Sequence, residues 1–123
     1  MADLPRWSTE AADAVLAECT AVLLVVPAEV RAVSSATTCA HRLRSLCDDI
    51  RVVVRLDGRS RLRDRDVTSA LGLDLLATVR HEAGLSAAAD RGEVIRWLRR
   101  ARLGRTAKQM VDQLLSGAPR TTQ

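Results

Sequence analysis

A short apolar run that ends in proline most constrains the fold of this chain. Residues 21–26 are alanine, valine and leucine without a polar break, and Pro27 follows them. Such a run is typical of a strand that is covered on both faces, as in a parallel sheet between helices. Residues 50–55 and 75–79 resemble it and follow at intervals long enough to hold a helix. The sequence therefore predicts an α/β protein.

The segments between these strands predict the helices that cover the sheet. Ser8 is the expected N-cap of the first helix. Apolar residues recur at helical spacing after Ser8, from Glu29 to Cys47, and from Leu103 to Leu115. Asp66 and Gly72 are expected to begin and end a short helix between the second and third strands. We expect a partial doubly wound (Rossmann-like) parallel sheet of about three strands, flanked by helices.

The composition fits one small domain and argues against a nucleic-acid ligand. The chain has 123 residues, no Phe or Tyr and two Trp, so its core must be built from Ala, Val and Leu. A net charge of +4 would suit nucleic acid, but nearly all the positive charge is arginine, which is typical of proteins from GC-rich genomes. Aromatic residues for base stacking are scarce. An arginine-rich nucleic-acid binder therefore remains only a weaker alternative.

Cysteine usage and the first residues predict a cytoplasmic protein. The three cysteines are odd in number and lack metal-ligand spacing, so reduced thiols are expected rather than a disulfide framework or a zinc site. Asp3 and Pro5 precede any apolar stretch, which argues against a signal peptide. The longest apolar run is too short to span a bilayer.

Five segments in succession carry a resemblance to a known family. They are Asp3-Leu4-Pro5-Arg6, residues 23–31, residues 70–76, residues 82–85 and residues 91–93. Their order and spacing resemble the C-terminal half of the MinD/ParA family of P-loop ATPases, closest to its actinobacterial septum site-determining and CpaE/TadZ-like branch. The resemblance covers residues 1–116, and a flexible tail is expected over residues 117–123.

The resemblance implies a vestigial nucleotide site. In the family, a strand ends in an aspartate that helps to hold Mg²⁺ through water, and Asp3 occupies its place. A strand remnant that ends at Asp3 is therefore expected, and Asp3 would be a metal-site residue in a complete domain. Arg55 stands where the family often has an asparagine that contacts adenine, and Arg80 and His81 lie in the segment that flanks the base. Arginine stacks on a base but lacks the paired donor and acceptor of asparagine. No catalytic residue is assigned to this chain.

The phosphate-binding loop of the family is not found in this sequence. None of the 123 residues forms a G-x-x-x-x-G-K-[ST] motif, whose backbone N–H groups and lysine bind phosphates. Catalysis of phosphoryl transfer depends mainly on positioning and charge neutralisation. We therefore predict that the chain alone takes no cofactor and does not hydrolyse ATP, although ATP and Mg²⁺ belong to the family.

Two functions follow from this comparison. By resemblance, the chain is a truncated or degenerate MinD/CpaE-like ATPase that is linked to septum-site positioning or to pilus and secretion assembly. The alternative is a standalone, non-catalytic protein-interaction module.

Both interpretations predict a protein partner. Without upstream strands, the sheet is expected to have an open apolar edge, which a homo-oligomer or another protein would cover. Residues 95–102 join Trp, Leu and arginines, as do helices that bind anionic membranes. We favour the simpler interpretation that their few apolar residues cover the sheet, so peripheral membrane contact is the less favoured alternative.

Overall fold

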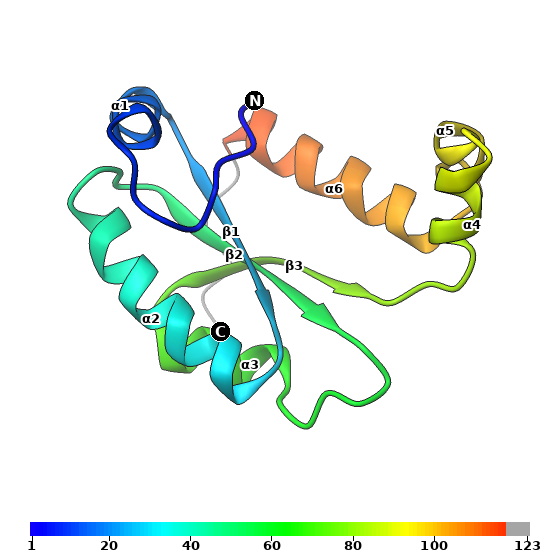
Figure 1. Cartoon of the computed structure of the whole chain (residues 1–123), viewed down its shortest axis with the longest axis horizontal. Coiled ribbons are helices and arrows are strands. Elements are labelled where there is room, and N and C mark those ends of the chain that lie inside the picture. Colours follow the sequence, from blue (N-terminus) through cyan, green and yellow to red (C-terminus); the bar gives the residue numbers. More distant parts are fainter. Residues whose placement is uncertain (118–123) are drawn as a thin grey trace.

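The computed structural model describes residues 1–117. This part of the chain alternates between helices and strands (Figure 1). The elements are α1 (Glu10–Glu18), β1 (Val22–Pro27), α2 (Val30–Arg44), β2 (Ile50–Leu56), α3 (Asp64–Leu71), β3 (Asp74–Arg80), α4 (Leu85–Asp90), α5 (Val94–Leu98) and α6 (Arg102–Ser116). Beyond Gly117, the predicted flexible tail lies outside the described residues.

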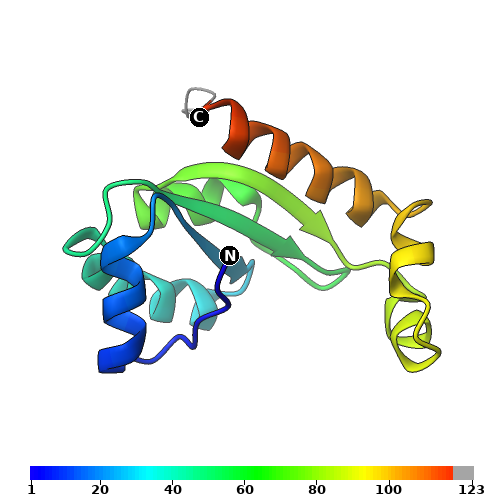
Figure 2. The same cartoon turned by 90° about the horizontal axis from the view of Figure 1, so that it is seen from above.

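The strands form one sheet in the order β1-β2-β3, and both pairs are parallel. Helices α2 and α3 join consecutive strands and contact each other as well as the sheet. Helix α6 packs against β3 from the opposite side of the sheet from α2 (Figure 2). The structure therefore confirms the predicted α/β class, with a three-stranded parallel sheet between helices.

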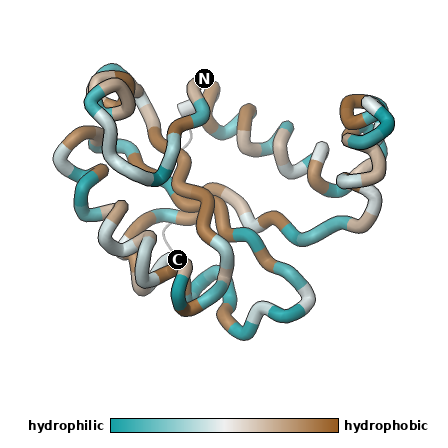
Figure 3. Tube along the Cα trace, viewed as in Figure 1, coloured by the Kyte–Doolittle hydropathy of each residue, from teal (hydrophilic) through white to brown (hydrophobic). Residues whose placement is uncertain are grey.

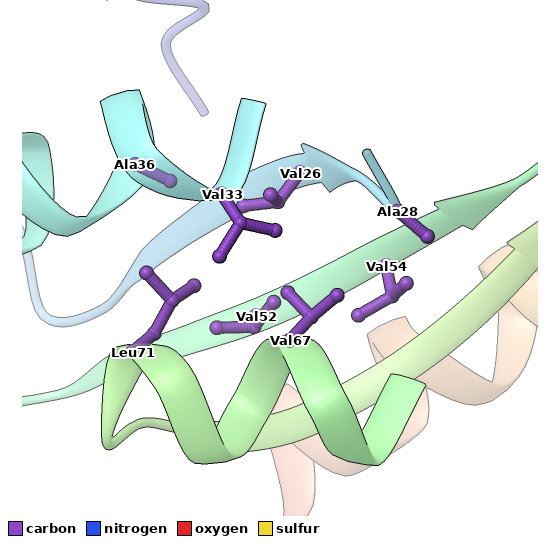
Figure 4. Packing of buried hydrophobic residues seen from close by; sticks show 8 residues of the cluster. All are labelled: Val26, Ala28, Val33, Ala36, Val52, Val54, Val67 and Leu71. Carbon is purple, nitrogen blue, oxygen red and sulfur yellow. The ribbon is translucent and has the colours of Figure 1, made fainter. Parts of the chain in front are cut away.

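The main core lies between the sheet and the helices α2 and α3 (Figure 4). Its most deeply buried large side chains are valines, namely Val26, Val52, Val54 and Val67. Burial of a valine contributes roughly 1.5–3 kcal/mol. Apolar residues follow the crossing strands in the middle of the chain trace, and polar ones follow the outer turns (Figure 3). A core without Phe or Tyr is thus built from small branched side chains, as the composition predicts.

Two helix boundaries differ from the prediction by a residue or more. The side chain of Thr9, rather than that of Ser8, caps α1. Helix α3 begins at Asp64, so Asp66 lies within its first turn and does not precede it. There, the Asp66 carboxylate accepts a hydrogen bond from the backbone N–H of Arg63 at 2.8 Å. Gly72 ends α3 as predicted, in the left-handed conformation (φ 64°) that glycine adopts without strain.

The segment before α1 contains no strand. The prediction of a strand remnant that ends at Asp3 is therefore wrong. Leu4 instead packs against a small cluster formed by Leu16, Leu43 and Ile50. Burial of Leu4 in this cluster stabilises the segment without strand pairing.

The outer edge of β1 is open, because β1 pairs only with β2 within residues 1–117. On the side of β2, the backbone N–H of Val22 donates to the carbonyl of Asp49 at 2.8 Å, and that of Ala28 donates to the carbonyl of Arg55 at 2.9 Å. Alternate residues of a parallel strand face alternate neighbours, so Leu23 and Val25 direct their backbone groups outwards. Leu23 is 36% exposed and Val25 is 59% exposed.

Candidate functional site at the carboxyl ends of the strands

The carboxyl ends of the strands bring three predicted site residues to one edge of the sheet. Arg55 is the penultimate residue of β2, Arg80 ends β3, and His81 follows. The backbone N–H of His81 donates to the carbonyl of Leu56 at 2.9 Å, so the two strand ends stay paired beyond β3. Open α/β sheets bind ligands at this edge.

The side chains of these three residues do not converge on one point. Leu56 packs on the core beside α2 and α3, and Arg80 is its partner in the ladder, so Arg80 belongs to the same face. Arg55 precedes Leu56 and therefore faces the side of α6. Arg55, Arg80 and His81 are all exposed. The two arginines thus lie on opposite faces of the sheet.

Asp3 is not brought to this edge. The next residue, Leu4, packs on a cluster that includes Ile50, the first residue of β2. Asp3 is therefore tied to the amino ends of the strands, away from Arg55, Arg80 and His81, and it is exposed. Its role at a magnesium site stays a prediction about a complete domain.

Sequence reasoning missed a small cavity at the end of β3. It has a volume of about 140 Å³ and is lined in part by Asp64, Thr78, Glu82 and Arg102. The Thr78 hydroxyl donates to the Asp64 carboxylate at 3.0 Å and so joins β3 to the start of α3. An aspartate in the first turn of a helix was the only sequence signal for this contact.

Glu82 occupies the N-terminus of α6. Its Oε1 accepts a hydrogen bond from the backbone N–H of Leu103 at 2.6 Å. A carboxylate at this position satisfies one of the unpaired N–H groups of the first turn and interacts favourably with the positive end of the helix dipole. The two partners are 21 positions apart in the sequence, so local sequence patterns could not reveal this contact.

The residues at this edge do not fit a nucleoside triphosphate. Asp64 and Glu82 place two carboxylates in the cavity beside Arg80 and Arg102, and so offset the positive charge that phosphates would need. Glu82 also takes up a helix N-terminus that would attract an anion. Within residues 1–117, no three His, Cys, Asp or Glu side chains are grouped to hold a metal ion.

A wider groove follows the open edge of β1. It has a volume of about 740 Å³ and lies between β1, α2 and the segment before α1. Its lining includes residues 24–27 of β1 together with Trp7, Arg6, Arg31 and Arg42. Arg42 pairs with Asp13 at 3.4 Å. The groove therefore combines an unpaired strand edge, apolar surface and positive charge.

The amino end of the sheet holds a buried arginine that the sequence analysis also missed. Arg51 on β2 is 8% exposed and donates from Nε and Nη2 to the two carboxylate oxygens of Asp49, at 3.0 Å each. These hydrogen bonds raise the pKa of Arg51, whereas burial lowers it and the charges of Asp49 and Asp74 raise it further. A charged residue inside an apolar strand run was the available signal.

Comparison with known proteins gives relatives without a described activity. Two uncharacterized proteins of Mycobacterium tuberculosis, from strains CDC 1551 / Oshkosh and ATCC 25618 / H37Rv, are each 34% identical to this chain over 112 residues. The match covers 91% of this chain, which spans 32% of the length of either curated relative. No family model and no solved structure gives a significant match.

The helices of residues 1–117 are all too short or too polar to cross a membrane.

Proposed function

We propose that this chain is part of a degenerate MinD/ParA-like domain that works in the cytoplasm by associating with protein rather than by hydrolysing ATP. The observation that carries this proposal is the open edge of β1 with its groove. By the resemblance, the machinery it serves concerns septum-site positioning or pilus and secretion assembly.

The edge of β1 has the features of a strand-addition site. The outward backbone groups of Leu23 and Val25 are available to hydrogen-bond with another strand. Parallel sheets are usually covered on both faces and rarely end in an exposed apolar strand. Val25 is 59% exposed at this edge, which supports a partner there.

The relatives support a partner within a larger protein. A matching segment makes up 32% of each relative, so it occurs in chains about three times as long. In the proposed domain, the strand that covers β1 would come from the half that carries the phosphate loop, on the same or on a separate chain. The alternative is a standalone interaction module that covers the edge with its own copy or with another protein.

Light scattering at tens of micromolar tests the role of the edge. We expect the chain to self-associate and Val25→Lys to shift it towards the monomer, because a lysine at an exposed edge opposes strand addition. Leu85→Lys is the matched control, since Leu85 is an exposed apolar residue (37%) but lies on α4, far from β1 (Figure 1). A wild-type monomer, or equal effects of the two variants, would contradict the proposal.

Two further measurements address the nucleotide and the larger protein. We expect the purified chain to show no ATP turnover above the buffer rate, and measurable turnover would overturn the non-catalytic assignment. The intact mass of the endogenous protein separates the two forms of the proposal. A species well above 13.4 kDa favours part of a larger ATPase-like protein, and one at 13.4 kDa favours the standalone module.

A further inference from the structure

The positive charge of this protein is concentrated on one projecting part of the fold. Helices α4 and α5 extend beyond the end of β3, away from the rest of the sheet (Figures 1 and 2). We call residues 90–105 the arginine arm. It carries six arginines and two acidic residues, a net charge of +4 that equals the formal net charge of the whole chain. Acidic and basic residues therefore balance elsewhere.

The arginine arm and the loop before α4 line a hollow, and we call its apolar lining residues the floor. The hollow has a volume of about 400 Å³. Trp97, Ala83 and Ala101 supply its apolar lining, and Arg96 and Arg100 line it as well. A concave surface with an aromatic side chain and a few charged groups is the usual form of a binding site.

The acidic residues of this hollow are already engaged. Glu93 pairs with Arg91 at 3.0 Å, and Glu82 accepts the backbone N–H of Leu103. Within residues 1–117, no carboxylate lies within ion-pair distance of Arg96 or Arg100. The hollow therefore presents two guanidinium groups that have no internal acidic partner.

The floor of the hollow is held in place by the backbone. Gly84 adopts a φ of 100°, and a Cβ built on it would lie 3.1 Å from Nε1 of Trp97, so the indole packs directly on the glycine. The N–H of Ala101 donates to the carbonyl of Trp97 at 3.1 Å, and Ala101 is buried. A floor fixed in this way lowers the ordering cost of binding.

We propose that the arginine arm docks an acidic segment of a partner protein. Carboxylates of that segment pair with Arg96 and Arg100, whose planar guanidinium groups match carboxylate geometry. An aliphatic side chain of the same segment covers Trp97. Ile95, which is 74% exposed, extends the apolar contact beside the arginines. This inference is independent of the edge of β1.

The local structure favours protein over the other polyanions. Helix α5 has five residues and α4 has six, which is too short for the continuous apolar face of a membrane-bound helix. Single-stranded nucleic acid is bound by successive bases that stack on aromatic rings. Trp97 packs on Gly84 and is the one aromatic residue among residues 1–117 that lines the hollow, so it offers no series of stacking platforms. An exposed isoleucine gains nothing from a phosphate backbone.

Fluorescence anisotropy with a labelled synthetic helix of glutamate and leucine on one face tests this proposal. We expect the full chain to bind this peptide and the double variant Arg96→Gln/Arg100→Gln to bind at least about tenfold more weakly. The control is Arg61→Gln/Arg65→Gln, which removes the same charge from exposed positions before and in α3. Its binding should stay within about twofold of wild type.

Each other outcome overturns the proposal. Equal weakening by the two double variants would indicate general electrostatic attraction, and no binding of the peptide at low salt would remove the site. Tighter binding to phosphatidylserine vesicles or to a DNA duplex, abolished by the same Arg96 and Arg100 changes, would assign the arm to that ligand.

In a Trp7→Leu background, peptide binding should shift the emission of Trp97, because the peptide covers its ring.

Discussion

Replacing Arg51 with methionine tests whether the ion pair at the amino end of the sheet stabilises the fold. The Arg51 guanidinium makes two hydrogen bonds to Asp49, and Arg51 also stands opposite Asp74 in the ladder between β2 and β3. Methionine keeps most of the aliphatic stem, so the substitution removes the charge and its hydrogen bonds with little loss of packing. The effect therefore reports on the ion pair itself.

The expected loss is about 2–3 kcal/mol of unfolding free energy. Each hydrogen bond to a charged group contributes about 1.5–3 kcal/mol, and removing one partner of a buried ion pair destabilises a fold. The Asp49 side chain is 24% exposed, so water partly replaces the lost guanidinium. The loss of unfolding free energy is therefore smaller than the sum of two such hydrogen bonds. The variant also avoids the desolvation cost of burying a guanidinium group, which reduces the expected loss of unfolding free energy further.

Urea unfolding followed by far-ultraviolet circular dichroism, at one protein concentration, measures this loss. Arg61→Met is the matched control, because Arg61 is exposed, and it should change stability by less than about 0.5 kcal/mol. A double-mutant cycle with Asp49→Asn should give a coupling of about 1 kcal/mol or more. An Arg51→Met variant as stable as the control would refute the reasoning.

Two further predictions concern single residues. Gly84→Ala should destabilise the fold by about 1–3 kcal/mol in thermal melts, because an alanine would be strained at φ 100° and its Cβ would crowd Trp97. Gly58→Ala, where a Cβ meets nothing within 4 Å, should have little effect, and equal shifts would contradict this account. The Arg59 backbone N–H lowers the pKa of Asp57 from its ordinary value of 3.8. Asp57 should therefore stabilise the fold above about pH 4 and lose this contribution as the pH falls through its lower folded pKa. In the Asp57→Asn variant, the unfolding free energy should therefore fall less steeply as the pH is lowered. An NMR titration midpoint of Asp57 at or above 3.8 would contradict this prediction.

The strands could be predicted because buried parallel strands leave a local signal. The apolar runs 21–26, 50–55 and 75–79 correspond to β1, β2 and β3, with boundaries that differ by at most one residue. The helix starts were less certain, since neighbouring Ser, Thr and Asp residues are chemically equivalent as caps. Thr9 was therefore not distinguishable from Ser8 by sequence alone.

The candidate site was predictable only in part. Arg55, Arg80 and His81 share an edge because parallel strands end on the same side. Their side-chain directions depend on the register between β2 and β3, which shifts at Val52 and Val53 and cannot be derived from either strand alone. The contact of Glu82 with α6 and the position of Asp3 depend on tertiary packing, which local patterns do not encode.

The carboxyl ends of the strands are used here to hold the fold together, and the binding surfaces that we propose lie elsewhere. At this edge, Glu82 fixes α6 and Asp64 fixes β3. The edge of β1 would bind through backbone hydrogen bonds and apolar contact, whereas the arginine arm would bind through charge. Added salt screens the attraction between exposed charges, but it does not weaken the association of apolar surfaces. Higher ionic strength should therefore weaken peptide binding at Arg96 and Arg100 while leaving self-association through Val25 intact, so each surface can be tested without the other.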